Sequence, residues 1–209
     1  MKFVSLISSG IDSPVATYLM SKKADEIILV HGDNRPYTDE KEINNFLKLA
    51  KHIKKILKCK NKTILITHGK SLDKYKKNCD NKFTCVFCKR MLLRYAEKIA
   101  EKENASAIIM GDSLGQVASQ TLQNIKTIEQ AVKIPVLRPL IGLDKEDVIK
   151  IAKEIGTYDL SILPSKGCSA VPNKPSTQAC LKKIIEEESK IDILKLVNEA
   201  FENKKIIKI

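Results

Sequence analysis

Apolar and polar residues along the chain follow the pattern of short buried strands that alternate with amphipathic helices. Mostly apolar runs of strand length occur at residues 3–7, 26–31, 63–67, 107–110 and 134–137. Apolar residues recur at helical spacing in the segments 13–22, 39–58, 88–103 and 144–155. Strands that are apolar throughout belong to sheets that are covered on both faces. The pattern therefore predicts an α/β fold with a doubly wound parallel sheet in a single domain.

Helix ends and irregular segments complete this prediction. Asp144 is expected to cap the last of these helices, and Gly156 is expected to end it. Residues 72–83 are polar and show no clear period, and residues 165–176 hold too much proline and glycine for a regular element. Residues 178–209 are charged and have helical spacing. They are predicted to form a helical extension that packs on a main domain of residues 1–177.

The chain is basic, with 37 lysine and arginine residues against 25 aspartate and glutamate residues, a net charge of +12. Such a balance suits a polyanionic partner, because neutralising phosphates releases counterions. The lysines are scattered along the predicted helices, however, and a lysine-rich proteome explains the charge equally well. The sequence has no tryptophan and few aromatic residues, which argues against a base-stacking platform for single-stranded nucleic acid.

No apolar run is long enough to span a membrane, and no signal segment opens the sequence. We therefore expect a cytoplasmic protein with no membrane partner. In a reducing compartment disulfides are normally transient. Metal, cluster or redox chemistry is then the better explanation for at least some of the six cysteines, which are Cys59, Cys79, Cys85, Cys88, Cys168 and Cys180.

The first predicted strand ends in a turn of small polar residues, Ser8-Ser9-Gly10-Ile11-Asp12-Ser13, which leads onto the first helix. The unpaired N–H groups and the positive dipole end at such a helix start favour a phosphate. The turn resembles the PP-loop, SGGxDS, of ATP pyrophosphatases, except that Ser9 stands where the pattern has its first glycine. Its spacing fits neither a Walker loop nor a dinucleotide-binding turn. An ordinary strand-to-helix turn is the alternative.

A second turn of the same kind, Gly111-Asp112-Ser113-Leu114-Gly115, follows the strand at 107–110. Two such turns at the carboxyl ends of two parallel strands are what a nucleotide crevice requires. The sequence therefore predicts one nucleotide site between the two turns.

Longer stretches of the chain are similar to the catalytic region of tRNA 4-thiouridine synthetases, which are tRNA sulfurtransferases. They are LISSGIDSPVA from Leu6, Arg90-Met91, GDSLGQVASQTLQN from Gly111 and RPLIGLDKEDVIKIAKEIGTYDLSILP from Arg138, in the family's order. The resemblance implies an ATP-dependent sulfurtransferase with the PP-loop ATP pyrophosphatase fold. Such an enzyme adenylates O4 of a tRNA uridine with ATP and Mg²⁺ and releases pyrophosphate. A sulfur nucleophile then displaces AMP, which leaves 4-thiouridine.

The resemblance also implies which residues contact the nucleotide. They are Leu6, Ile7, Ser8, Ser9, Gly10, Asp12, Ser13, His31, Gly32, Lys89, Gly111 and Gln120. Lys89 would place a cation at the phosphates, and Asp12 would act catalytically by orienting the loop or Mg²⁺. For His31 the alternative is a buried histidine that a backbone carbonyl satisfies, and for Gln120 it is a helix surface residue.

Three cysteines form the second part of the site that the resemblance implies. Cys168 aligns with the sulfur-handling cysteine of the family. Archaeal members that resemble this chain combine it with a C-x-x-C, here Cys85 to Cys88, to hold a [4Fe–4S] cluster with one iron open for exogenous sulfide. Cys85, Cys88 and Cys168 are therefore predicted as metal ligands and as catalytic residues beside Asp12.

Other roles for the cysteines stay open at this point. A Zn²⁺ site could use Cys79 or Cys180 as a fourth ligand, and Cys85 with Cys88 could be a plain redox dithiol. Cys59 is expected to be a small core residue within a helix.

Full-length family members begin with a ferredoxin-like region and a THUMP domain that grip tRNA, and some end in a rhodanese domain that makes a persulfide. The sequence matches neither the THUMP nor the rhodanese domain. We expect tRNA to be recruited through the chain's basic face or through a separate tRNA-binding subunit. Free sulfide or a persulfide carrier would be the sulfur donor, and a homodimer is left open. A sulfur-inserting ligase for a small molecule or a carrier protein, and a non-catalytic nucleotide-binding module, remain alternatives.

Overall fold

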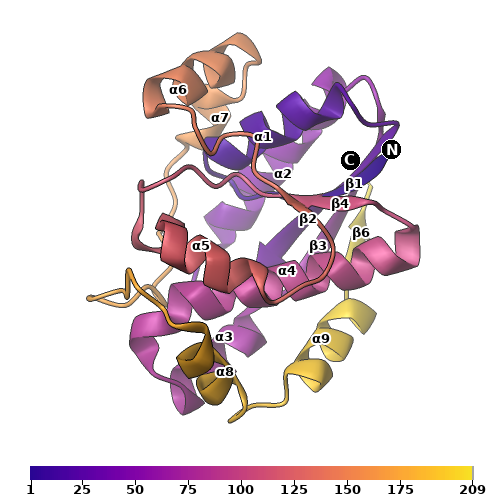
Figure 1. The fold of residues 1–209 in the computed structure, drawn as a ribbon. Coiled ribbons are helices and arrows are strands. Elements are labelled where there is room, and N and C mark those ends of the chain that lie inside the picture. Colours follow the sequence, from indigo (N-terminus) through magenta and orange to yellow (C-terminus); the bar gives the residue numbers. More distant parts are fainter. Residues whose placement is uncertain (209) are drawn as a thin grey trace.

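The computed structural model describes residues 1–208, which form one sheet with helices on both faces (Figure 1). The strand order is β5-β4-β1-β2-β3-β6. The strands are β1 (Lys2–Leu6), β2 (Glu26–Asp33), β3 (Lys60–Thr67), β4 (Ala107–Ile109), β5 (Val136–Leu137) and β6 (Lys205–Ile207). Strands β1 to β5 pair in parallel, whereas β6 pairs antiparallel with β3. The predicted α/β fold with a largely parallel, doubly wound sheet is confirmed.

The helices form two layers on opposite faces of the sheet (Figure 1). One layer consists of α1 (Asp12–Ser21), α2 (Glu40–Ile56), α6 (Lys145–Glu154) and α7 (Tyr158–Ser161). The other consists of α3 (Gly69–Asn78), α4 (Thr84–Glu103), α5 (Leu122–Glu129), α8 (Leu181–Glu188) and α9 (Ile193–Glu202). Neighbouring residues of β1 supply both cores, because Phe3 packs with the first layer and Val4 with the second. No helix within residues 1–208 has the length and apolar character needed to cross a membrane.

The order of the strands reverses at β1, which has β2 on one side and β4 on the other. Ser5 of β1 is in register with Leu29 of β2 and with Ile109 of β4. In open α/β sheets, ligands bind outside the carboxyl ends of the strands at such a reversal. The two glycine- and serine-containing turns, residues 8–13 and 111–115, follow β1 and β4 at this edge.

Several elements differ from what the sequence predicts. Residues 205–207, expected to be helical, form β6, because they complete the outer edge of β3. Segment 72–83 contains most of α3 and a short 3₁₀ turn, and a second 3₁₀ turn at 118–120 precedes α5. Asp144 occupies the N-cap position of α6, but its side chain makes no capping hydrogen bond. Cys59 packs against the core from the connection between α2 and β3, not from within a helix.

Candidate nucleotide site and its cysteine neighbours

The turn between β1 and α1 is held by its own serine side chains. The backbone N–H of Ser8 donates to Ser13 Oγ over 2.9 Å, and the two hydroxyl oxygens lie 3.1 Å apart. The N–H of Gly10 donates to Ser8 Oγ over 3.3 Å. Ile11, at the N-cap of α1, offers no side-chain acceptor to the first helical turn. The N-terminus of α1 therefore stays available to an anion, as the helix dipole favours.

The turn after β4 packs directly against this first turn. A Cβ added to Gly111 would lie 2.6 Å from both the backbone N and the Cα of Ser13. These are backbone atoms that have no rotamer to move into, so only glycine allows the two turns to approach this closely. The contact between Gly111 and Ser13 sets the width of the crevice.

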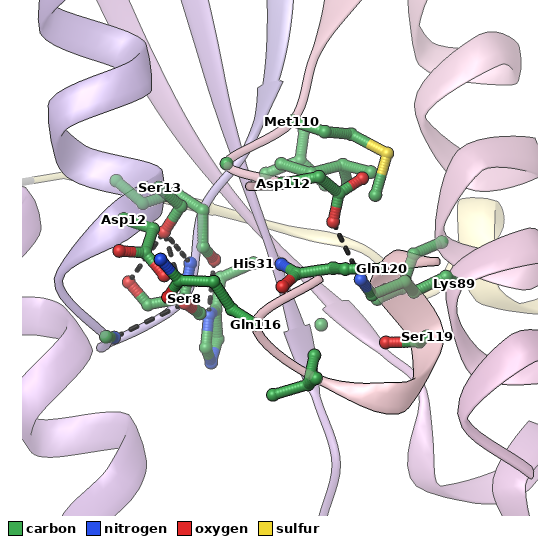
Figure 2. Close-up of a pocket in the computed structure, with 18 of the residues that line it drawn as sticks. Ser8, Asp12, Ser13, His31, Lys89, Met110, Asp112, Gln116, Ser119 and Gln120 are labelled. Carbon is green, nitrogen blue, oxygen red and sulfur yellow. Dashed lines mark hydrogen bonds and ion pairs between the residues drawn. The ribbon is translucent and has the colours of Figure 1, made fainter. Parts of the chain in front are cut away.

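A cavity of about 470 Å³ lies between the two turns (Figure 2). Most of the residues that the sequence predicts for nucleotide contact line it, namely Leu6, Ile7, Ser8, Gly10, Asp12, Ser13, His31, Gly32, Lys89, Gly111 and Gln120. Figure 2 shows Ser8, Asp12 and Ser13 on one side and Lys89 with Gln120 on the other. Ser9 is outside the lining, and its hydroxyl instead donates to Glu42 Oε1 over 2.6 Å.

His31 lies at the back of this cavity in a fixed orientation. Its ring stacks on Phe46 with centroids 4.0 Å apart, and Nδ1 lies 2.8 Å from the carbonyl oxygen of Ile7. Burial lowers the pKa of His31, so the ring is neutral at neutral pH. Because a carbonyl only accepts, Nδ1 carries the proton and Nε2 is left as an acceptor. The backbone carbonyl thus satisfies one ring nitrogen and leaves the other free for a ligand.

Three buried acceptors of the cavity lining have no hydrogen-bond partner among the described residues. They are His31 Nε2, Asn34 Oδ1 and Gln120 Oε1. A buried polar atom without a partner costs free energy, so such atoms are rare in proteins unless a ligand or water completes them. A ligand that carries N–H and O–H groups, such as an amino-purine with a ribose, matches three acceptors.

Asp112, which lines the cavity, forms ion pairs with two cations, Lys89 and Arg138. Lys89 Nζ of α4 lies 2.7 Å from Asp112 Oδ1, and Arg138 Nε lies 3.2 Å from Oδ2. Burial by itself would raise the pKa of Asp112, but the charges and hydrogen bonds of Lys89 and Arg138 outweigh it and lower that pKa. Asp112 stays ionised and fixes Lys89 at the cavity wall (Figure 2).

Cys85 and Cys88 lie in the first two turns of α4, close to Lys89. Burial, followed by the neighbouring charges of Cys168 and Cys85, raises the pKa of Cys88 to about 12. Burial and the charge of Cys168 raise the pKa of Cys85, and Lys89 acts in the opposite direction on both thiols. Cys168 thus acts electrostatically on both thiols of the C-x-x-C, and Lys89, one residue after Cys88, lines the nucleotide cavity.

This arrangement is not a preformed metal centre. Among residues 1–208, no three His, Cys, Asp or Glu side chains stand together in a metal-holding group. The Cys88 sulfur instead lies 3.2 Å from Nε2 of His68, a fully buried ring. The thiols of Cys85, Cys88 and Cys168, whose charges act on one another, nevertheless form a donor set of the kind that binds an iron–sulfur cluster or zinc.

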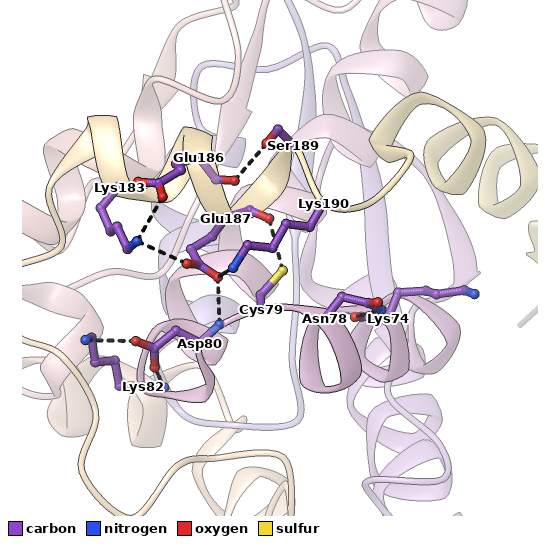
Figure 3. A network of polar contacts seen from close by, with 10 residues as sticks. All are labelled: Lys74, Asn78, Cys79, Asp80, Lys82, Lys183, Glu186, Glu187, Ser189 and Lys190. Carbon is purple, nitrogen blue, oxygen red and sulfur yellow. Dashed lines mark hydrogen bonds and ion pairs between the residues drawn. The ribbon is translucent and has the colours of Figure 1, made fainter.

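The remaining cysteines lie elsewhere. Figure 3 shows Cys79 beneath α8, where its thiol donates to the carbonyl oxygen of Glu187 over 3.2 Å. The Glu187 side chain accepts from the N–H of Asp80 and pairs with Lys183 and Lys190. Cys79 is thus part of the contact that attaches α8 to the end of α3. Cys180 is exposed at the N-cap of α8.

A sequence model of the family described as "Thiamine biosynthesis protein (ThiI)" matches residues 1–193. The chain belongs to the ThiI family. The family resemblance seen in the sequence is therefore confirmed. The matched residues include both turns of the cavity and all six cysteines.

Relatives within the ThiI family support the assignment. A "Probable tRNA sulfurtransferase" of Methanothermobacter thermautotrophicus is 44% identical over 203 residues, which cover 96% of this chain and 52% of that protein. One of Methanosarcina mazei is 40% identical over 209 residues, with 100% and 52% covered. The chain thus spans about half the length of the curated relatives that it matches.

Solved structures agree in fold. The chain superimposes on a 4-thiouridine synthetase from an RNA complex with bound ATP, with a TM-score of 0.93 and 34% identity over 99% of this chain and 54% of the other. An NMN synthetase from Francisella tularensis has a TM-score of 0.56 at 15% identity, over 96% of this chain and 83% of that one, and shows a shared fold.

Several lining residues of this ThiI-family cavity were not singled out in the sequence. The most consequential is Lys145, which begins α6 and forms an ion pair with Asp12. Asp112 belongs to the second turn but had no role assigned, and Asn34 and Glu42 follow β2 along the chain. Composition gave no signal for Lys145, which is one lysine among many; its place in the family-like segment that begins at Arg138 was the one signal that could have found it.

Proposed function

We propose that this chain is the catalytic part of an ATP-dependent tRNA sulfurtransferase that makes 4-thiouridine. The observation that carries the proposal is the cavity itself. It joins an uncapped helix N-terminus, the cation Lys89, and the unpartnered buried acceptors of His31, Asn34 and Gln120. A triphosphate joined to an adenosine supplies the anion and the N–H and O–H donors that these groups lack. The ATP-bound relative of the same fold adds support.

The phosphates would lie over residues 8–13, with the base toward His31 and Gln120. N–H groups of the turn, together with Lys89, would stabilise the charge that develops on the departing pyrophosphate. Asp12, the carboxylate of the turn, would hold Mg²⁺ or orient the turn with Lys145 as its counter-ion. Uridine O4 attacks the α-phosphorus, the bond to the bridging oxygen breaks, and pyrophosphate leaves with that electron pair.

In the second step a sulfur nucleophile attacks C4 of the adenylated base, and AMP leaves with the oxygen that was O4. We propose that Cys168 places the sulfur, because it aligns with the sulfur-handling cysteine of the family and its charge acts on Cys85 and Cys88. These three residues would hold a [4Fe–4S] cluster, with Zn²⁺ as the alternative, since their donor set fits either. When bound, a cluster would supply an iron that can bind exogenous sulfide. A persulfide carrier is the alternative sulfur donor.

For the substrate we propose tRNA, held by a separate tRNA-binding subunit. The chain is basic, and phosphate contacts position a nucleic acid without reading its sequence. A second subunit that grips the tRNA raises the effective concentration of the target base at the ATP site. The same proposal allows the catalytic unit to be a homodimer.

The deciding experiment measures pyrophosphate release and 4-thiouridine formation with ATP, Mg²⁺, sulfide and a tRNA transcript. The chain is assayed alone and with a THUMP-containing partner, and RNA binding is followed by gel shift at several salt concentrations. We expect weak binding by the chain alone with a steep salt dependence, and selective thiolation only with the partner. Selective thiolation by the chain alone would remove the partner requirement. No RNA affinity even at low salt would favour the ligase for a small molecule or carrier protein.

A further inference from the structure

The part of the Cys168 loop from residue 163 to residue 169 is held by one short segment, residues 37–45, around the start of α2. Backbone and side-chain groups of this segment bind the loop at four points. The carbonyl oxygen of Tyr37 accepts from the backbone N–H of Ser169 (2.8 Å) and from its hydroxyl (3.0 Å). Asp39 Oδ2 accepts from the N–H of Lys166 (3.4 Å), and Glu42 Oε2 accepts from the hydroxyl of Ser165 (3.0 Å). Asn45 Nδ2 donates to the carbonyl oxygen of Leu163 (3.3 Å). The position of the Cys168 thiol therefore depends on this segment.

Glu42 is the member of this segment that also reaches the phosphate turn. Its Oε1 accepts from Ser9 Oγ over 2.6 Å, while its Oε2 accepts from Ser165 Oγ, three residues before Cys168. The backbone of Glu42 is fixed in the first turn of α2, because its N–H donates to the capping side chain of Asp39. One rigidly held carboxylate thus joins two loops that lie more than 150 residues apart in sequence.

The hydroxyl that starts this bridge is a feature of this chain's own turn. Ser9 stands where the SGGxDS pattern has glycine, which has no side chain with which to bind a carboxylate. Ser9 does not line the cavity, and its hydroxyl is directed to Glu42 instead. Its contact with Glu42 is what the substitution of serine for glycine adds.

We propose that Glu42 is a positioning residue that couples the phosphate turn, through Ser9, to the Cys168 loop, through Ser165. Occupancy of the turn by phosphate and the placement of the Cys168 thiol then depend on each other, since coupling between two sites is reciprocal. The contacts of Glu42 with Ser9 and Ser165 are observed in the structure, whereas the role of ATP as the ligand of the turn rests on the proposed function. The bridge would bring the sulfur-handling thiol into place when the nucleotide site is filled.

The bridge itself can be tested without nucleotide, by the rate at which iodoacetamide modifies Cys168 in metal-free protein, followed by mass spectrometry of its peptide. Ser9→Ala removes a hydroxyl that does not touch the loop, yet we expect it to raise the Cys168 rate about threefold, as Ser165→Ala does. The double variant should show no more than the larger single effect, because both changes cut one bridge. An unchanged Cys168 rate in Ser9→Ala, or effects that multiply, would overturn the proposal.

Two controls keep this result specific. Glu40→Gln alters another carboxylate in the first turn of α2 that pairs with Arg35, and should leave the Cys168 rate unchanged. Cys180, which is exposed, reports on general changes within every sample. Far-ultraviolet circular dichroism verifies that each variant is folded.

A second measurement separates the bridge from the proposed function. Equilibrium dialysis with a non-hydrolysable ATP analogue shows whether the wild-type chain binds nucleotide. Absence of binding would count against the proposed function, and the iodoacetamide experiment on the single and double variants would still test the bridge. If the analogue binds, we expect it to change the wild-type Cys168 rate and to have no such effect in Glu42→Ala. A nucleotide effect that persists in Glu42→Ala, or is absent from the wild type, would overturn the coupling.

Discussion

Lys145 forms an ion pair with Asp12, although the two residues are 133 positions apart in the chain. Each is the first residue of its helix, so the N-termini of α6 and α1 meet at one wall of the cavity. The Lys145 side chain is 40% exposed and that of Asp12 is 27% exposed, and an ion pair with this much solvent contributes little to stability. Its consequence is electrostatic, because it places a cation beside the phosphate turn.

Replacing either partner should therefore affect chemistry much more than folding. Asp12→Ala is expected to abolish pyrophosphate release, and Lys145→Ala to slow it about a hundredfold, as loss of one preorganised charge at a developing anion does. The measurement is a coupled pyrophosphate assay alongside thermal unfolding, in which both variants should melt near the wild type. Lys150→Ala, on the same helix but outside the cavity lining, should keep wild-type activity. Pyrophosphate release that survives Asp12→Ala would refute the assignment of the turn.

Gly111→Ala should disrupt the crevice, because the new Cβ would meet backbone atoms of Ser13 at 2.6 Å. Separating the two turns would misplace the N–H groups of residues 8–13, so we expect ATP affinity to fall at least about tenfold, comparable to loss of one or two charge-assisted hydrogen bonds. Gly142→Ala is the matched control, since nothing lies within 4 Å of its added Cβ and its backbone needs no positive φ. Equal ATP affinities of the two variants, measured by calorimetry, would contradict this account.

Protein reconstituted without oxygen should bind iron and sulfide and show thiolate-to-iron charge-transfer absorption. Cys85→Ala, Cys88→Ala and Cys168→Ala should each lose this absorption, because a cluster needs every one of its few thiolate ligands. Cys59→Ala should keep it, since Cys59 packs against the core on the other face of the sheet. Stoichiometric zinc without sulfide, determined by elemental analysis, would instead identify a zinc site.

Glu188 should make the fold sensitive to acid. Burial would raise its pKa, but the hydrogen bonds and charges of Arg94 and Arg90 outweigh it and lower the pKa of Glu188 from 4.5 to about 2. A carboxyl whose pKa is lower in the folded state stabilises the fold above its unfolded pKa, and this contribution is lost as the pH falls from 4.5 toward 2. Glu188→Gln should therefore cost about 3–5 kcal/mol at neutral pH by leaving Arg90 buried without its counter-charge.

The cost of Glu188→Gln should shrink as the pH is lowered toward 3, because Glu188 is then protonated in the unfolded wild type and part of its net stabilisation of the fold is lost. Urea unfolding at neutral pH and near pH 3 measures both values. Glu186→Gln changes an exposed carboxyl of the same helix that pairs with Lys183, and should shift stability little at either pH. A cost for Glu188→Gln that is independent of pH would show that its ionisation does not stabilise the fold.

Local patterns in the sequence predicted the sheet and the two turns well, because both depend on short-range properties. Residues 27–30, at the centre of β2, are apolar in every position, and such a run is stable only when both faces are covered. The turn at residues 8–13 is recognised by small polar side chains beside a helix start. The tail was harder, since residues 205–207 become a strand only because the edge of β3 is there to pair with them.

The sequence alone indicated the five parallel strands, most of the helices between them, the location of the turn at residues 8–13 and the family resemblance, because each is written in contiguous residues or their spacing. Only the tertiary structure decided which distant groups meet. Lys145 reaches Asp12, Glu42 joins Ser9 to Ser165, and Cys88 meets His68. These contacts depend on how the layers of helices pack on the sheet. The chain has many chemically equivalent lysines, glutamates and serines, and no local pattern of polarity or period indicates which of them the packing brings together.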